Sequence, residues 1–212
     1  MMDSPIITYL GQSGFLLEYN NSKLIIDPTN KRAGNRDGDI IYCTHNHFDH
    51  IGGVNIFLER NPSAILVCNE QIARKFSKWD ERVKVVSDGE TFTNDPWRLQ
   101  FTRLKHGILK GTLNLAVEIS VGSFAFAHCG DAVEFHDFPK QPINVLAIPI
   151  SGGFAASPGK ALKMVAGLEE PRPTVIPMHW LMRNPSGFCK KLHDQMPEVK
   201  CVVPTNGEPL EL

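Results

Sequence analysis

The chain has 212 residues, of which 42% are hydrophobic and 21% charged, and its formal net charge at pH 7 is −1. A globular chain of this length buries about 70% of its unfolded surface, so its core requires no disulfide framework. The near-neutral charge and the lack of a Lys/Arg run give no general footprint for a nucleic-acid backbone, although local basic patches remain open. No apolar stretch approaches the roughly 18 residues of a membrane span. We therefore expect neither nucleic acid nor a membrane as a partner.

The cysteines are five in number, which is odd, and they contain no CxxC pair: Cys43, Cys68, Cys129, Cys189 and Cys201. This pattern argues against a disulfide scaffold and against a cysteine zinc site. The N-terminus lacks a cationic segment followed by an apolar core, as a secretory signal would have. We expect reduced thiols and a cytoplasmic protein.

The first part of the chain is typical of antiparallel hairpins. Residues 6–27 contain three short apolar segments separated by Gly/Ser and Asn-Asn turns. After a polar stretch, residues 40–44 have the pattern of a buried strand, which ends abruptly at a histidine cluster. Residues 52–60 then have the pattern of a helix that is closed by Asn61-Pro62.

From residue 64 onward, strand and helix patterns alternate. The expected strands are 64–68, 83–86, 91–93, 99–104, 113–119, 123–128, 143–150 and 173–178. The expected helices are 69–79, 157–168 and 186–196. No repeat, low-complexity linker or break in composition divides the chain, so we predict a single domain over residues 1–212, with packed sheets inside and helices outside.

The segment 44–50 places three imidazoles and a carboxylate within six residues: His45, His47, Asp49 and His50. A surface loop of solvated histidines is one explanation, but neutral imidazole is the commonest metal ligand, and we favour a metal site. His45 and His47 can point the same way from an extended loop, whereas Asp49 and His50 diverge. The spacing therefore fits two ions, one bound by His45 and His47 and the other by Asp49 and His50.

Three further residues fit the missing ligands, because each follows an apolar strand: His106, Asp131 and His179. Any one of them alone would more often be a surface residue or a support for a ligand. Since a site with two ions still lacks ligands, we predict that all three bind metal.

The HxHxDH motif followed by Gly-Gly, a separate histidine, a Gly-Asp pair and a late Pro-x-His resembles the metallo-β-lactamase superfamily over essentially the whole chain. The segments ITYLGQSGFLLEY, LIIDP, HCGDA, AIPISGGF and VIPMHW are most similar to its L-ascorbate 6-phosphate lactonase-like branch of metal-dependent hydrolases. The resemblance implies an α/β (α+β) fold, a four-layer αββα sandwich of two mixed β-sheets flanked by helices.

The resemblance also implies a division of the ligands between two metal ions. By motif position, one ion is held by His45, His47 and His106. The other is held by Asp49, His50 and His179, and Asp131 bridges the two.

A pair of divalent ions can activate water without a serine or cysteine nucleophile. We expect Zn²⁺, with Mn²⁺ as an alternative, and a hydroxide bridging two metal ions as the nucleophile, with Asp49 and Asp131 as the catalytic residues. The residual positive charge favours a small anionic ester, lactone or phosphoester as substrate. A nuclease or phosphodiesterase of the same fold and a non-catalytic metal-binding protein are the alternatives; the sequence sets no oligomeric state.

Other residues near the predicted ligands have open roles. Gln12 stands where proteins of the resembling branch often carry histidine, and Asp27 either braces the histidine loop or starts a turn. His128 is a candidate support for Asp131. Lys105, Lys110, Arg183 and Asn184 could contact substrate, but each is more often an ordinary surface residue, and we do not predict them as site residues. Candidate pocket walls, which could also simply pack, are Phe135, Phe138 and Phe154.

Overall fold

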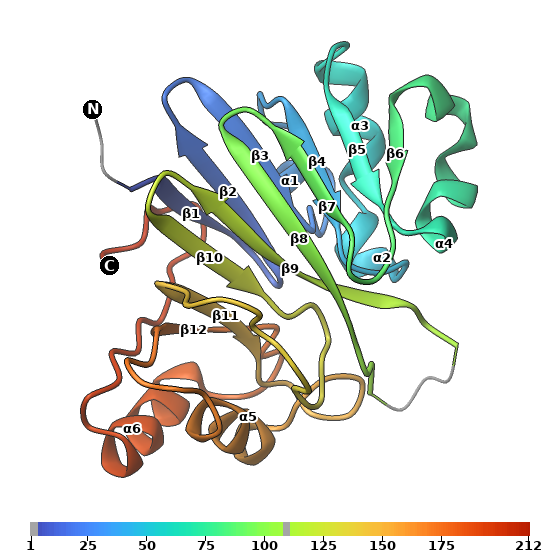
Figure 1. Cartoon of the computed structure of the whole chain (residues 1–212). Coiled ribbons are helices and arrows are strands. Elements are labelled where there is room, and N and C mark those ends of the chain that lie inside the picture. Colours follow the sequence, from blue (N-terminus) through green and yellow to red (C-terminus); the bar gives the residue numbers. More distant parts are fainter. Residues whose placement is uncertain (1–3, 108–110) are drawn as a thin grey trace.

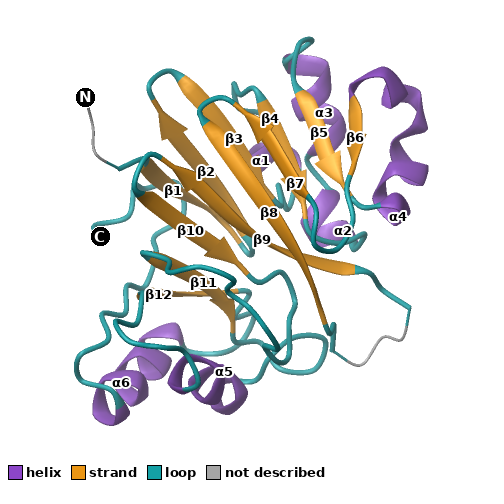
Figure 2. Cartoon of the chain, in the orientation of Figure 1, coloured by secondary structure: helices purple, strands orange, loops and turns teal. Residues whose placement is uncertain are grey.

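Two six-stranded sheets pack face to face in the computed structural model, which describes residues 4–107 and 111–212 (Figure 1). Helices lie on the outer faces of both sheets (Figure 2). The α/β sandwich of two mixed sheets flanked by helices, expected from the sequence, is confirmed.

The first sheet has the order β1-β2-β3-β4-β5-β6. Its strands are β1 Ile6–Gly11, β2 Gly14–Tyr19, β3 Ser22–Ile26, β4 Ile40–Cys43, β5 Ile65–Cys68 and β6 Val83–Val85. The first three strands pair antiparallel, as the hairpin pattern predicts, and β3 to β6 pair parallel. The helices along this half are α1 Lys31–Gly34, α2 Phe48–Ile51, α3 Val54–Arg60, α4 Glu70–Ala73 and the 3₁₀ helix η1 Arg74–Arg82.

The second sheet has the order β12-β11-β10-β9-β8-β7. Its strands are β7 Thr91–Asn94, β8 Trp97–Leu104, β9 Asn114–Val121, β10 Phe124–His128, β11 Val145–Pro149 and β12 Thr174–Met178. Strands β7 to β10 pair antiparallel, and β10 to β12 pair parallel. Helices α5 Pro158–Ala166 and α6 Pro185–Gln195 cover its outer face (Figure 2).

Three apolar clusters hold these layers together. The central cluster lies between the sheets and contains fully buried aromatic side chains, among them Phe15, Tyr42 and Trp97. A second cluster joins the second sheet to α5 and α6, and a third joins the first sheet to α1, α3 and α4. Strands β4 and β11 are buried along their whole length, as parallel strands covered on both faces must be.

The helix expected over residues 69–79 is only partly present. Asn69 caps the short helix α4, but the chain then continues as the 3₁₀ helix η1, in which Phe76 has non-helical backbone angles. Contacts with α3 hold η1 in this shape, since Trp79 donates to Asn55 and Arg82 donates to the carbonyl of Leu58. Tertiary hydrogen bonds therefore override the local helical pattern.

The expectation of five reduced thiols is wrong for two of them. Cys189 in α6 forms a disulfide with Cys201, which lies beside β12 through a bridge to Val175. Cysteines twelve residues apart in the chain are brought to a Cα–Cα distance of 5.4 Å because helix and strand run side by side. The other three cysteines are buried and free. Cysteine chemistry thus gives no support to the expected cytoplasmic location.

Within the described ranges, no helix is long and apolar enough to cross a membrane.

Candidate metal centre

The seven predicted ligand residues meet at one edge of the sandwich, where strands end. Four come from the segment after β4 and from helix α2: His45, His47, Asp49 and His50. The other three follow β8, β10 and β12: His106, Asp131 and His179. Residues up to 134 positions apart are thus brought together by the two sheets.

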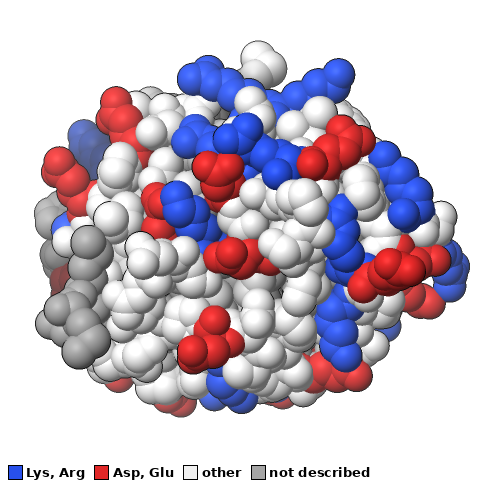
Figure 3. Space-filling model, turned by 90° about the horizontal axis from the view of Figure 1, so that it is seen from above, with Lys and Arg blue, Asp and Glu red and all other residues white. Residues whose placement is uncertain are grey.

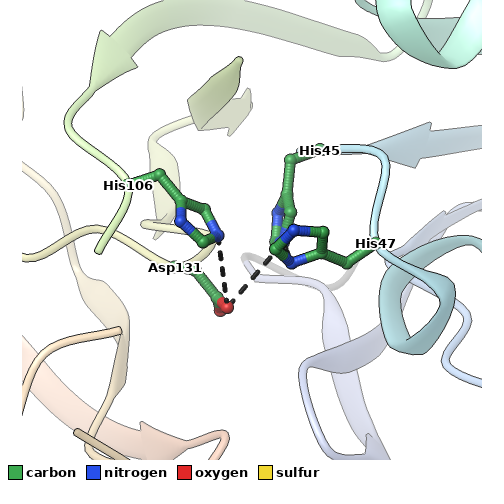
Figure 4. A group of neighbouring side chains, drawn as sticks. All are labelled: His45, His47, His106 and Asp131. Carbon is green, nitrogen blue, oxygen red and sulfur yellow. Dashed lines mark hydrogen bonds and ion pairs between the residues drawn. The ribbon is translucent and has the colours of Figure 1, made fainter. Parts of the chain in front are cut away.

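One group of four side chains comes from both sheets. His45, His47, His106 and Asp131 each offer a ligand atom, and these atoms all lie within 4.8 Å of one another. Figure 4 shows the three imidazoles and the carboxylate pointing toward a common space. The Nε2 atoms of His45 and His106 both lie 3.7 Å from Oδ2 of Asp131.

The second group contains Asp49, His50 and His179, whose ligand atoms also lie within 4.8 Å of one another. Nε2 of His179 is 3.2 Å from Oδ2 of Asp49. Asp131 also faces this group, because its carboxylate lies 3.4 Å from Nε2 of His50 and 3.5 Å from Nε2 of His179. The carboxylate of Asp131 therefore stands between the two groups.

A buried carboxylate, Asp27, holds two of these histidines in orientation. Its Oδ1 accepts the backbone N–H of Thr44 at 2.8 Å, and its Oδ2 accepts the Thr44 hydroxyl at 2.7 Å and lies 2.7 Å from Nδ1 of His50. These contacts support Asp27 as a brace of the histidine loop rather than as a residue that only starts a turn. With Nδ1–H of His50 donating to Asp27, its Nε2 is left facing Asp131.

The hydroxyl of Thr44 sets the orientation of His45 in the same way. A hydroxyl has one proton, and Thr44 donates it to Asp27, so its contact of 3.0 Å with Nδ1 of His45 has the imidazole as donor. His179 is held likewise: Ser151 donates to the carbonyl of Gly152 and lies 3.2 Å from Nδ1 of His179. In both histidines Nε2 is then the nitrogen that faces the centre, 3.1 Å from Nδ1 of His47 in the case of His45 and 3.2 Å from Oδ2 of Asp49 in the case of His179. These roles of Thr44 and Ser151 carry no signal in the sequence, although Thr44 precedes the predicted ligand His45 and Ser151 follows a predicted strand.

The electrostatics favour neutral imidazoles in the first group. Burial lowers the pKa of His106 to about 4 and also lowers the pKa of His45 and of His47. Neutral imidazole is the form that binds metal. His50 differs, because the carboxylates of Asp27 and Asp131 outweigh its burial and raise its pKa above the ordinary value.

Several buried polar atoms in the first group have no hydrogen-bond partner among the described residues: both ring nitrogens of His106 and Oδ1 of Asp131. Such an atom costs about 1–3 kcal/mol. A divalent cation accepts lone pairs from imidazole and carboxylate together, so this set of donors fits a bound metal ion.

Gln12 contacts the second group directly. Its Nε2 donates to Oδ2 of Asp49 at 3.0 Å. Burial opposes the charge of Asp49, but His179, the nearby His50 and the amide of Gln12 hold the pKa of its carboxyl below the ordinary value. The backbone carbonyl of Gln12 also accepts the N–H of His179 at 2.7 Å, so this turn joins β1 to a predicted ligand.

Behind Asp131, the turn at Gly130 has little space. Gly130 has a φ of +56°, and a Cβ there would lie 2.1 Å from Oδ1 of Asn114, the atom that accepts the N–H of Asp131. The buried His128 accepts the N–H of Gly130 at 3.1 Å, so it supports the same turn, as expected. Only glycine fits this position without moving Asp131.

The candidate substrate contacts divide by their surroundings. Lys105 pairs with Glu134 at 3.1 Å, and Asn184 caps helix α6. Arg183 donates from Nε to the carbonyl of Ser151 at 3.2 Å, close to the centre. Lys110 lies outside the described residues. Of the candidate pocket walls, Phe135 packs on Phe138 and Phe154 is exposed.

The fold and the arrangement of this site define a class. Residues 6–179 match the family described as Beta-lactamase superfamily domain. Among solved structures, a metallo hydrolase from Ignicoccus hospitalis aligns with a TM-score of 0.82 at 22% identity, over 97% of each chain. The metallo-beta-lactamase fold protein YhfI from Bacillus subtilis aligns with a TM-score of 0.82 at 13% identity, over 98% of this chain and 99% of that one. The protein is a member of the metallo-β-lactamase superfamily.

A narrower assignment follows from sequence. The UPF0173 metal-dependent hydrolase of Thermococcus kodakarensis is 30% identical, over 97% of this chain and 99% of that protein. The chain therefore belongs to the UPF0173 metal-dependent hydrolase family. The superfamily and the metal-dependent hydrolase family expected from the motifs are confirmed, whereas the ascorbate 6-phosphate lactonase-like branch stays a prediction.

Proposed function

We propose that the protein binds two divalent metal ions and hydrolyses a small anionic ester, lactone or phosphoester. The observation that carries this proposal is the pair of ligand groups that share the carboxylate of Asp131. Zn²⁺ suits the imidazole-rich set, with Mn²⁺ as the alternative.

Each residue has a part in this proposal. The first ion would be held by His45, His47 and His106 and the second by Asp49, His50 and His179, and Asp131 would contribute to both. When bound, a pair of such ions lowers the pKa of water toward neutrality and polarises the substrate oxygen. Asp49 is the carboxylate that water can reach, because its side chain is 22% exposed and that of Asp131 is 1% exposed. It is the group that orients an attacking water or accepts its proton.

Arg183 supports an anionic substrate. Its guanidinium is anchored through Nε to the carbonyl of Ser151, the residue whose hydroxyl orients His179. Among the described residues, no carboxylate forms an ion pair with Arg183, whereas Lys105 is paired with Glu134. A fixed guanidinium with free N–H groups is well suited to a carboxylate or phosphate.

The near-neutral net charge of −1 and the mixed charges on one face of the molecule support a small substrate over a nucleic acid. Lys and Arg are interleaved with Asp and Glu over the face seen in Figure 3. A nuclease or phosphodiesterase acting on a polymer would have a continuous basic track.

Metal analysis with an activity screen tests the proposal. We expect about two zinc or manganese ions per chain after purification without chelator, and a sharp loss in Asp131→Ala, because that carboxylate serves both groups. The loaded protein is then screened against p-nitrophenyl acetate, a γ-lactone and bis(p-nitrophenyl) phosphate. Failure to take up metal on reconstitution would contradict the proposal and favour a non-catalytic role.

A further inference from the structure

Large apolar side chains are exposed around the metal centre. Of the eight exposed large hydrophobic residues in the described ranges, four lie on segments that adjoin the predicted ligands. They are Phe48, Phe154, Leu181 and Met182, with exposed fractions of 82%, 50%, 61% and 100%. We call these four residues the apolar rim. Exposed apolar side chains that gather at one place mark a binding surface.

Phe48, Leu181 and Met182 lie close to predicted ligands in the sequence. Phe48 lies between His47 and Asp49 at the start of α2. Leu181 and Met182 occupy the tip of the turn closed by the hydrogen bond from the N–H of Arg183 to the carbonyl of Trp180, directly after the ligand His179. Each is at most three residues from a predicted ligand.

The backbone of Leu181 is unusual. Its φ is +50°, in the left-handed region that leucine rarely adopts, and its side chain is exposed. Neither burial nor turn propensity explains a leucine here, because glycine or asparagine relieves the strain. Strained residues that project from a loop at a site point to a binding role.

Phe154 is tied to the opposite side of the centre. Its carbonyl accepts the N–H of Gly107 at 2.9 Å, next to the ligand His106. A Cβ on Gly107 would lie 2.1 Å from that carbonyl oxygen, so the loop is pressed against the end of β8. The same loop begins at Ser151, which orients His179. It therefore spans the centre from His106 to His179.

We infer that the apolar rim binds an apolar group of the substrate, so the substrate carries an alkyl or aryl chain next to the bond that is hydrolysed. This inference rests on the proposed function and narrows its substrate class. The occupant is the substrate because all four residues adjoin ligand-bearing segments, and a group seated among them lies against the reacting centre. With Arg183 nearby, an amphiphilic molecule fits best.

The test is a chain-length series with the zinc-loaded full chain. The substrates are p-nitrophenyl acetate, butyrate, hexanoate and octanoate. Burying a methylene contributes about 0.8 kcal/mol, which is about fourfold in affinity, so kcat/KM should rise two- to fourfold per added methylene, mainly through KM. The rise should flatten in Phe48→Ser and in the double variant Leu181→Ser, Met182→Ser.

A matched control is available in Ile6→Ser. Ile6 is also an exposed apolar residue, but it stands at the far end of the six-residue strand β1, roughly 17 Å from the turn at Gln12. The control variant should keep the full chain-length dependence. Metal content should be unchanged in all of these variants, because none of the substituted residues is a predicted ligand.

A readout without turnover separates the inference from the proposed function. Calorimetric titration of the zinc-loaded protein should show octanoate binding at least tenfold more tightly than acetate, and the rim variants should remove this difference. Ester hydrolysis that is independent of chain length would contradict the substrate-binding role of the apolar rim but not the proposed hydrolase activity. Equal binding of octanoate and acetate would contradict the inference about the apolar rim, even if the protein cleaves none of the esters. If sedimentation showed a wild-type dimer that dissociates in the double variant, the apolar rim would instead be a contact between two copies of the chain.

Discussion

Hydrogen bonds around the ligands decide which atom of each side chain faces the centre. Asp27 and Thr44 direct Nε2 of His45 and of His50 inward, and Ser151 does the same for His179. Free imidazoles would sample both tautomers and several rotamers, and fixing them beforehand lowers the entropic cost of binding metal. We therefore expect these supporting residues to raise the affinity of the predicted ligands for metal.

Gln12 is a positioning residue that acts through Asp49. The substitution Gln12→Ala removes the donor 3.0 Å from Oδ2 of Asp49 and leaves that carboxylate free to turn. We expect kcat for the best substrate of the screen to fall about tenfold, or about 1.4 kcal/mol, with KM and metal content nearly unchanged. Steady-state kinetics measures this effect, and Gln100→Ala on β8 is the control. Loss of metal in step with activity would show a structural role instead.

Zinc binding should depend on pH through His50. The carboxylates that raise its pKa keep a proton on the ring in metal-free protein, and a protonated ring cannot bind metal. Proton competition therefore begins above the ordinary histidine pKa of about 6.5, and zinc affinity should fall as the pH falls from 8 to 6, by about tenfold per pH unit for one proton. Chelator competition across this range measures it. A zinc affinity that does not change between pH 8 and pH 6 would refute the assignment of His50 as a metal ligand.

At the scale of elements, the strand ends place the ligands and helix α6 stands apart from them. α6 packs on the outer face of the second sheet and is joined to the chain beyond β12 by Cys189–Cys201. The disulfide closes a separation of 12 residues, for which loop-closure entropy predicts about 3 kcal/mol of stabilisation.

Reduction should therefore weaken the fold without emptying the site. In urea denaturation we expect dithiothreitol to lower the unfolding free energy of the wild type by up to about 3 kcal/mol, with metal content retained. The double variant Cys189→Ser, Cys201→Ser should already have the lower stability and should not respond to the reductant. An equal response of both proteins would mean that another thiol is involved.

The pattern of strands could be predicted because each is a local apolar segment between turn residues. The interruption between α4 and η1 could not, because the bonds that shape it reach from Trp79 and Arg82 to residues more than twenty positions away. The same holds for the disulfide, whose cysteines carry no spacing signal.

At the scale of the whole molecule, the candidate metal centre lies where the two sheets meet. His45 and His50 follow strand β4 of the first sheet, and His106, Asp131 and His179 follow strands of the second. A ligand that binds only the folded chain stabilises it by mass action.

Removal of metal should thus lower the stability of the entire sandwich. At a metal concentration about a thousand times Kd the gain is about 4 kcal/mol, which corresponds to roughly 10 °C in Tm for a chain of this size. Thermal unfolding with and without a chelator should show this difference in the wild type and in His136→Ala, whose side chain is exposed. The difference should shrink in His47→Ala, which lacks one ligand of the first ion only; a difference that keeps its full wild-type size there would contradict the role of His47 as a ligand.

The sequence by itself determined the strands, the helix starting at Ser157 and the four candidate ligands of the HxHxDH segment, because these signals lie within a few residues of one another. It also pointed to His106, Asp131 and His179 through their positions after strands. The family resemblance already implied that Asp131 serves both groups. Only the tertiary structure decided how far Asp131 lies from each group, that Asp27 and Gln12 contact His50 and Asp49, and that two cysteines pair. These contacts join residues distant in the chain, and their distances are set by how the two sheets pack, which no local pattern encodes.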